Sequence, residues 1–186
     1  MNETQPQSIY RLFAELLSYP TPALKTQVRQ CDRQLAPDYP QAAELIKSFE
    51  SAIANISIDR LEEIYTSTFD VNPICFPYPG FHLFGESFKR GEFLVKLQQK
   101  YQEQGFKAPE NELADHLPVL LQFLSTLDTD AVLAQELIED CLVPALQKMS
   151  EGFKTDNPYR TVLPALLSVL QSRRQPSEIA ALSSQS

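Results

Sequence analysis

The chain has 186 residues, of which 43% are hydrophobic, and its 16 basic and 24 acidic residues give a formal net charge of −8. This length corresponds to one domain with enough apolar residues for a sizeable core, which excludes global disorder. An acidic surface repels phosphate backbones, so we predict no nucleic-acid partner and expect a basic one, such as an arginine- or lysine-containing peptide. A simpler explanation, that the acidity only keeps the protein soluble, stays open.

The cysteines and the N-terminal sequence indicate a reducing compartment. Cys31, Cys75 and Cys141 are far apart without CxxC spacing, which predicts buried free thiols rather than a zinc site or a disulfide framework. The opening residues, MNETQPQS, lack the basic and apolar regions of a signal peptide, and no run approaches the ~18 apolar residues of a membrane span. We therefore expect a cytoplasmic protein that does not insert into membranes.

Four amphipathic helices are predicted in the first part of the chain. Apolar residues recur at helical spacing over residues 9–17, 24–35, 42–53 and 61–69. Pro20 ends the first of these helices and the APDYP segment ends the second. Ser57 is placed to cap the fourth.

Two further helices follow a central loop. Residues 86–104 carry one apolar stripe, and Gly105 suits the position after the helix, where a positive φ is favoured by glycine. Asp115 is expected to cap the next helix, with Pro118 in its first turn.

The last part of the chain is rich in prolines. Residues 131–149 predict a long helix in which Pro144 causes a kink or a break, and Asp156 and Pro158 open a final helix. Residues 173–186 are polar and predict a flexible tail. With about eight helices and no strand, the expected fold is all-α: a single-domain helical bundle with a long Pro/aromatic-rich loop.

That loop, residues 65–91, is the most informative segment. It contains aromatic residues and prolines far more densely than the helices around it, and loops often carry function. The side chains of Phe76, Tyr78, Phe81 and Phe84 either fold back onto the core or form a partly exposed apolar groove.

One enzymatic interpretation combines four residues: His82, Glu86, Asp115 and His116. His82 and Glu86 are four residues apart, as two metal ligands on one helix face would be, which predicts a small helical metal-dependent hydrolase. The chain has only 2 histidines and no H-E-x-x-H arrangement, so we keep this hypothesis as an alternative.

Two charged motifs have both structural and functional interpretations. Glu86 and Arg90 form an E-x-x-x-R pair, either a surface ion pair or a link between the loop and the following helix. Asp115, followed by His116, is either a helix cap or an acceptor for an incoming peptide or guanidinium group. In the second case we expect Asp115→Asn to weaken peptide binding with little loss of stability.

Several segments together resemble a known family. LLSYPTPAL, YTSTFD, GESFKRGEFLVKLQQKYQEQGF, ELADHLPVLLQFLS and NPYRTVLPALL are similar, in this order, to the NarJ-type nitrate reductase assembly chaperones of the TorD/DmsD redox-enzyme maturation group. The resemblance implies that residues 8–172 form an all-helical chaperone domain without catalytic activity. It also implies that the partner is the N-terminal peptide of a molybdoenzyme catalytic subunit, which receives molybdenum cofactor while this chain binds none stably.

The resemblance and the aromatic loop together give the predicted peptide-binding residues. They are Tyr65, Phe69, Phe76, Tyr78, Phe81, Phe84, Glu86, Arg90, Asp115, His116, Leu117, Pro118 and Leu121. The loop has more prolines and aromatic residues than the nitrate reductase branch leads us to expect, so another member of the dimethyl sulfoxide reductase superfamily is an alternative client. An adaptor that dimerises through this loop is a third hypothesis, and a monomer and a domain-swapped dimer are both compatible with the family.

Overall fold

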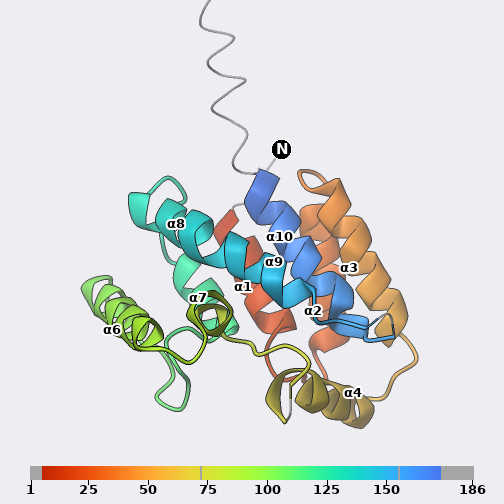
Figure 1. Ribbon diagram of the computed structural model, residues 1–186. Coiled ribbons are helices and arrows are strands. Elements are labelled where there is room, and N and C mark those ends of the chain that lie inside the picture. The colour runs from red at the N-terminus through yellow and green to blue at the C-terminus, as the bar shows by residue number, and fades with distance from the viewer. Residues whose placement is uncertain (1–5, 72, 155, 173–186) are drawn as a thin grey trace, which may run out of the picture.

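The computed structural model describes residues 6–71, 73–154 and 156–172, which fold into a bundle of helices (Figure 1). Its α-helices are α1 (Pro6–Leu16), α2 (Leu24–Leu35), α3 (Pro40–Ile53), α4 (Ile58–Tyr65), α5 (Pro79–Phe84), α6 (Phe88–Glu103), α7 (Leu117–Leu124), α8 (Val132–Glu136), α9 (Val143–Ser150) and α10 (Val162–Ser172). Two π-helical segments, η1 (Thr66–Asp70) and η2 (Leu137–Leu142), and a 3-10 helix, η3 (Pro158–Thr161), complete the described structure. These residues include no strand, and the predicted all-α single-domain fold is confirmed.

Helices α1, α2, α3, α7 and α10 build most of the core. α1 packs against α2 and α7, while α3 packs between α2 and α10 (Figure 1). Their inward faces carry large apolar side chains that have no exposed surface, among them Phe13, Phe49 and Phe123. Burial of apolar surface, at roughly 25 cal/mol per Å², is therefore the main force that holds these helices together.

Two of the predicted helix ends are confirmed. The Ser57 hydroxyl accepts a hydrogen bond from the backbone N–H of Arg60 at 3.3 Å and so caps α4. Gly105 follows the end of α6 and has a φ of +68°, a conformation that costs a residue with a Cβ atom about 1 kcal/mol or more.

One other helix signal is corrected, and the expected irregularity at Pro144 is located. Asn157, not Asp156, caps η3, because its side chain accepts a hydrogen bond from the backbone N–H of Tyr159 at 2.9 Å. The helical stretch expected over residues 131–149, with an irregularity at Pro144, is observed as α8, η2 and α9, which follow one another without a gap. Pro144 lies in the first turn of α9 and has no N–H to continue an α-helical ladder, which explains why the preceding turn widens to a π-helix.

All three cysteines are free and buried, as predicted. Burial raises the pKa of Cys31, Cys75 and Cys141 to about 12 in each case. Because the thiolate is the reactive form, we expect negligible reaction with Ellman's reagent at pH 8 in the native protein and reaction of all three thiols in denaturant. Rapid reaction of any thiol in the native protein would contradict this arrangement.

Two sequence predictions concern the ends of the chain and the membrane. Residues 173–186, the predicted flexible tail, lie outside the described residues, and the boundary of the domain at 8–172 stays a prediction. Over the part of the chain that the structure describes, none of the helices has the length and apolar composition that crossing a bilayer requires.

Candidate functional site

The aromatic segment 65–91 contains short ordered elements rather than one open loop. η1 extends α4 in π-helical form, and α5 is separated from α6 by Gly85, whose φ is +62°. Within the segment, the carbonyl of Thr68 accepts a hydrogen bond from Cys75 N–H at 3.0 Å. The carbonyl of Pro77 accepts one from Leu117 N–H at 2.8 Å, which fixes the segment to the start of α7.

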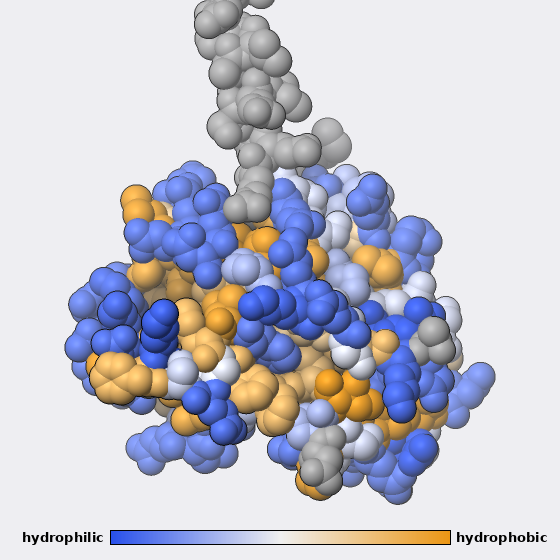
Figure 2. Space-filling model, viewed as in Figure 1, coloured by the Kyte–Doolittle hydropathy of each residue, from blue (hydrophilic) through white to orange (hydrophobic). Residues whose placement is uncertain are grey.

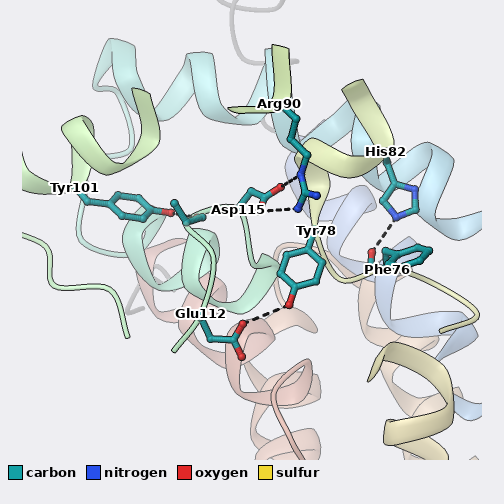
Figure 3. Close-up of polar contacts among 8 residues, drawn as sticks. Phe76, Tyr78, His82, Arg90, Tyr101, Glu112 and Asp115 are labelled. Atoms are coloured by element: carbon teal, nitrogen blue, oxygen red, sulfur yellow. Dashed lines mark hydrogen bonds and ion pairs between the residues drawn. The ribbon is translucent and has the colours of Figure 1, made fainter. Parts of the chain in front are cut away.

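A buried ion pair joins the start of α6 to the segment before α7 (Figure 3). Arg90 Nε lies 3.2 Å from Asp115 Oδ2, and Arg90 Nη2 lies 3.3 Å from Asp115 Oδ1. The Asp115 side chain is fully buried, and that of Arg90 is 16% exposed. The rings of Tyr78 and Phe81 lie 5.6 and 5.7 Å from the guanidinium carbon, so the same cation also contacts the aromatic segment.

This ion pair corrects two predictions. Arg90 pairs with Asp115 rather than with Glu86, which is exposed in the bend before α6. His116, rather than Asp115, occupies the N-cap position of α7, and its side chain makes no capping bond. The reason is that a buried carboxylate without a cation is costly, so Asp115 is paired in the interior instead of facing a groove.

Next to this ion pair lies a hollow of about 380 Å³. Its lining residues come from the α1–α2 connection, from the aromatic segment, from the connection between α6 and α7, and from α7 and the residue before it. They are Ser18, Tyr19, Tyr65, Phe69, Asp70, Pro77, Tyr78, Pro109, Asn111, Glu112, His116, Pro118, Val119 and Gln122.

Glu112 is one of the two carboxylates that line this hollow, and Figure 3 shows it beside Tyr78. Tyr78 Oη donates a long hydrogen bond of 3.5 Å to Glu112 Oε2, and His116 Nδ1 lies 3.7 Å from the same oxygen. Burial lowers the pKa of His116 although the charges of Glu112 and Asp115 oppose this, so the imidazole is neutral at pH 7. Burial also raises the pKa of Tyr78, and Glu112 raises it further.

The predicted site residues separate into three groups in the structure. Those that line the hollow are Tyr65, Phe69, Tyr78, His116 and Pro118. Those that do not line it and lie in or next to the interior are Arg90, Asp115, Leu117 and Leu121. Because Asp115, Leu117 and Leu121 are almost completely buried, they present no surface to a ligand.

The third group lies around α5 and outside the hollow. Phe76 and Phe81 pack with their ring centroids 4.3 Å apart, and Phe84 packs on Phe93 at 5.4 Å. Phe76 and Phe84 are 40% and 36% exposed, and Figure 2 shows apolar surface over α5 and beside α6. The aromatic segment therefore both folds back on its neighbours and leaves part of its surface open.

Most of the residues that line the hollow were missed by the sequence reasoning, among them the aromatic Tyr19 and the acidic Asp70 and Glu112. Each of these three lies beside a signal that the sequence does contain. Tyr19 precedes the helix-ending Pro20, Asp70 closes the YTSTFD motif, and Glu112 precedes Asp115 by three positions. The sequence signal for these three residues was that each is acidic or aromatic and lies close to a recognised motif.

The four residues of the alternative metal site do not form a ligand set. His82 Nε2 donates to the carbonyl of Phe76 at 2.8 Å, and the Asp115 carboxylate is paired with Arg90. Within residues 6–71, 73–154 and 156–172, no group of three or more His, Cys, Asp or Glu side chains is arranged to hold a metal ion. The metal-dependent hydrolase therefore has no support from this geometry.

Comparison with known families identifies the family of this chain. Residues 32–152 match the family model described as nitrate reductase delta subunit. The chain belongs to this family. The prediction of a NarJ-type chaperone from five ordered motifs is thereby confirmed.

Two relatives of this chain are named as assembly chaperones. The probable nitrate reductase molybdenum cofactor assembly chaperone NarJ of Bacillus subtilis (strain 168) is 29% identical over 179 residues, which cover 92% of this chain and 93% of that protein. The nitrate reductase molybdenum cofactor assembly chaperone NarJ of Escherichia coli (strain K12) is 29% identical over 100 residues, 53% of this chain and 41% of that protein.

A solved structure has the same fold as this chain. It is the crystal structure of a protein assigned as a redox enzyme maturation protein from Archaeoglobus fulgidus. The two structures superpose with a TM-score of 0.62 at 21% sequence identity, over 90% of this chain and 94% of the other. At this identity the likeness establishes the shared all-helical architecture.

Proposed function

We propose that this protein is a cytoplasmic maturation chaperone that binds the N-terminal peptide of a molybdoenzyme catalytic subunit, nitrate reductase or a close relative. It holds this client while molybdenum cofactor is inserted and before assembly or export. The cofactor is cargo for the client, and this chain binds none stably. The names of the NarJ relatives support the class of client.

The observation that carries the proposal is a row of three adjoining hollows, in which each outer hollow shares lining residues with the central one. The central hollow shares Tyr19 with one neighbour and Pro109 and Glu112 with the other. The carboxylates that line the row are Asp59, Glu62, Glu63, Asp70, Glu110 and Glu112. Among the described residues that line it, none is a lysine or an arginine.

This surface matches the chemistry of a basic amphipathic peptide. Tyrosine and phenylalanine rings, with Pro77 and Pro118, supply apolar contact area in the central hollow. The carboxylates supply counter-charge and raise the rate at which a positively charged peptide is captured. Tyr78 and His116, which are half-buried, are therefore the predicted peptide-binding residues that we propose to contact the client, whereas Tyr65, Phe69 and Pro118 also line the hollow but are themselves buried.

Calorimetric titration with the N-terminal ~30 residues of the molybdoenzyme subunit encoded nearest to this chain tests the proposal. We expect saturable one-to-one binding that weakens as the salt concentration rises, because screening reduces attraction between exposed charges. A scrambled peptide of identical composition is the control for charge alone. Equal binding of the scrambled peptide, or no binding by any molybdoenzyme N-terminal peptide at tens of micromolar, would contradict the function.

A further inference from the structure

The central hollow has a composition that suits one kind of side chain. Its walls include the aromatic rings of Tyr19, Tyr65, Phe69 and Tyr78, which are contributed by three separate segments. Two carboxylates, Asp70 and Glu112, also line it. A volume of about 380 Å³ is near the lower end of ligand pockets, enough for a single long side chain but not for a folded element.

The carboxylates of this hollow have capacity for a further partner. Glu112 Oε2 has only long contacts, 3.5 Å to Tyr78 Oη and 3.7 Å to His116 Nδ1, and its side chain is 31% exposed. An ionised carboxylate offers about four acceptor positions, so most of them remain available to a ligand. Glu112 and Asp70 both raise the pKa of Tyr65 and of Tyr78, after the larger effect of burial, because a nearby negative charge disfavours the phenolate.

We propose that the central hollow receives the guanidinium group of one arginine of the client peptide, with Glu112 and Asp70 as its counter-charges and the tyrosine rings as its walls. This inference rests on the proposed function and names the part of the client that the hollow selects. A planar guanidinium stacks on aromatic rings and bonds a carboxylate through two N–H groups, whereas an ammonium group does neither as well. Arginine is therefore preferred to lysine and to the α-amino group of the peptide.

The test uses the same N-terminal peptide with each arginine replaced singly by glutamine or by lysine. At one position we expect Arg→Gln to weaken binding by about tenfold or more, as loss of a charged hydrogen-bonded partner does, and Arg→Lys to restore part of the affinity. The other arginine replacements should each have a small effect that reflects screened, long-range attraction. Acetylation of the peptide N-terminus should leave the affinity within about twofold.

Variants of the protein locate the arginine. Glu112→Gln should weaken binding of the parent peptide about as much as the sensitive Arg→Gln replacement in the peptide does. It should change the affinity for the peptide that lacks this arginine very little. Asp70→Asn, at an exposed position, is a second variant that should show the same coupling. Glu139→Gln, an exposed carboxylate on η2 outside all of these hollows, removes the same charge and is the matched control.

The outcomes separate the two proposals. Absence of binding by the parent peptide overturns the proposed function and this inference with it. If the parent peptide binds but every arginine contributes equally to the affinity, this inference alone is overturned. The same holds if the effects of Glu112→Gln and Asp70→Asn on affinity do not depend on which arginine the peptide lacks. Loss of binding on N-terminal acetylation would assign the hollow to the α-amino group and would also overturn it.

Discussion

Replacing Arg90 with methionine is expected to lower the free energy of unfolding by about 3–5 kcal/mol, because the change leaves the Asp115 carboxylate buried without a cation. The same substitution removes the cation that contacts Tyr78 and Phe81. Urea unfolding followed by circular dichroism measures the loss. Replacement of both partners, Arg90→Met with Asp115→Leu, should recover much of it, because no unpaired charge then remains.

Arg60→Met is the matched control for this prediction. Arg60 pairs with Glu63 on the surface of α4, where the two side chains are 64% and 65% exposed, so its loss should cost less than about 1 kcal/mol. An Arg90→Met variant no less stable than Arg60→Met would show that the buried pair does not hold α6 to α7. The burial of Asp115 also reverses the sequence-based expectation for Asp115→Asn, which we now predict to affect stability.

Gly80→Ala is expected to destabilise the protein by about 1–3 kcal/mol, as insertion of a methyl group into a packed interior does. A Cβ atom on Gly80 would lie 2.6 Å from Asp115 Oδ2 and 2.9 Å from a carbon of the Phe93 ring. The absence of a side chain at this position is what lets α5 approach the ion pair. The added methyl group would therefore press on the Asp115 carboxylate, which Arg90 contacts from α6.

Gly91→Ala is the control, and the opposite sign is expected. Gly91 lies inside α6, and a Cβ atom there meets nothing within 4 Å. Alanine should stabilise the helix by roughly 0.5–1 kcal/mol, because glycine is the less favourable residue in a helix interior. Similar destabilisation by both substitutions would mean that the loss at Gly80 does not arise from its close contacts.

Local features were predictable from the sequence because their causes are local. Helical periodicity identified the core faces of the helices. Gly105 was identified because the position that follows α6 has a positive φ, which glycine favours. Ser57 was assigned correctly because a capping hydroxyl needs only the N–H groups that follow it. The family resemblance added the function class, which periodicity and composition do not contain.

The candidate site was predictable only in part because its contacts join distant segments. Arg90 and Asp115 are 25 positions apart, and nothing in either motif indicates that they meet. Glu86, the partner suggested by helical spacing, precedes α6 and so is not on its surface. Similarly, Tyr19 reaches the hollow from the α1–α2 connection, which only tertiary packing brings beside Tyr65, at 5.5 Å between ring centroids.

The location of peptide binding is the central claim, and amide chemical shifts of the ¹⁵N-labelled protein test it most directly. On titration with the client N-terminal peptide, we predict the largest shifts at the non-proline residues of the segments 18–19, 65–71, 77–78 and 109–119, which line or adjoin the row of acidic hollows. A separate hollow between α3 and α10, lined by Asp38, Tyr39, Ser168 and Gln171, is the internal comparison. Shifts concentrated there, or around Phe84 and Phe88 on the α5–α6 surface, with none at Tyr19, Asp70 or Glu112, would contradict the account.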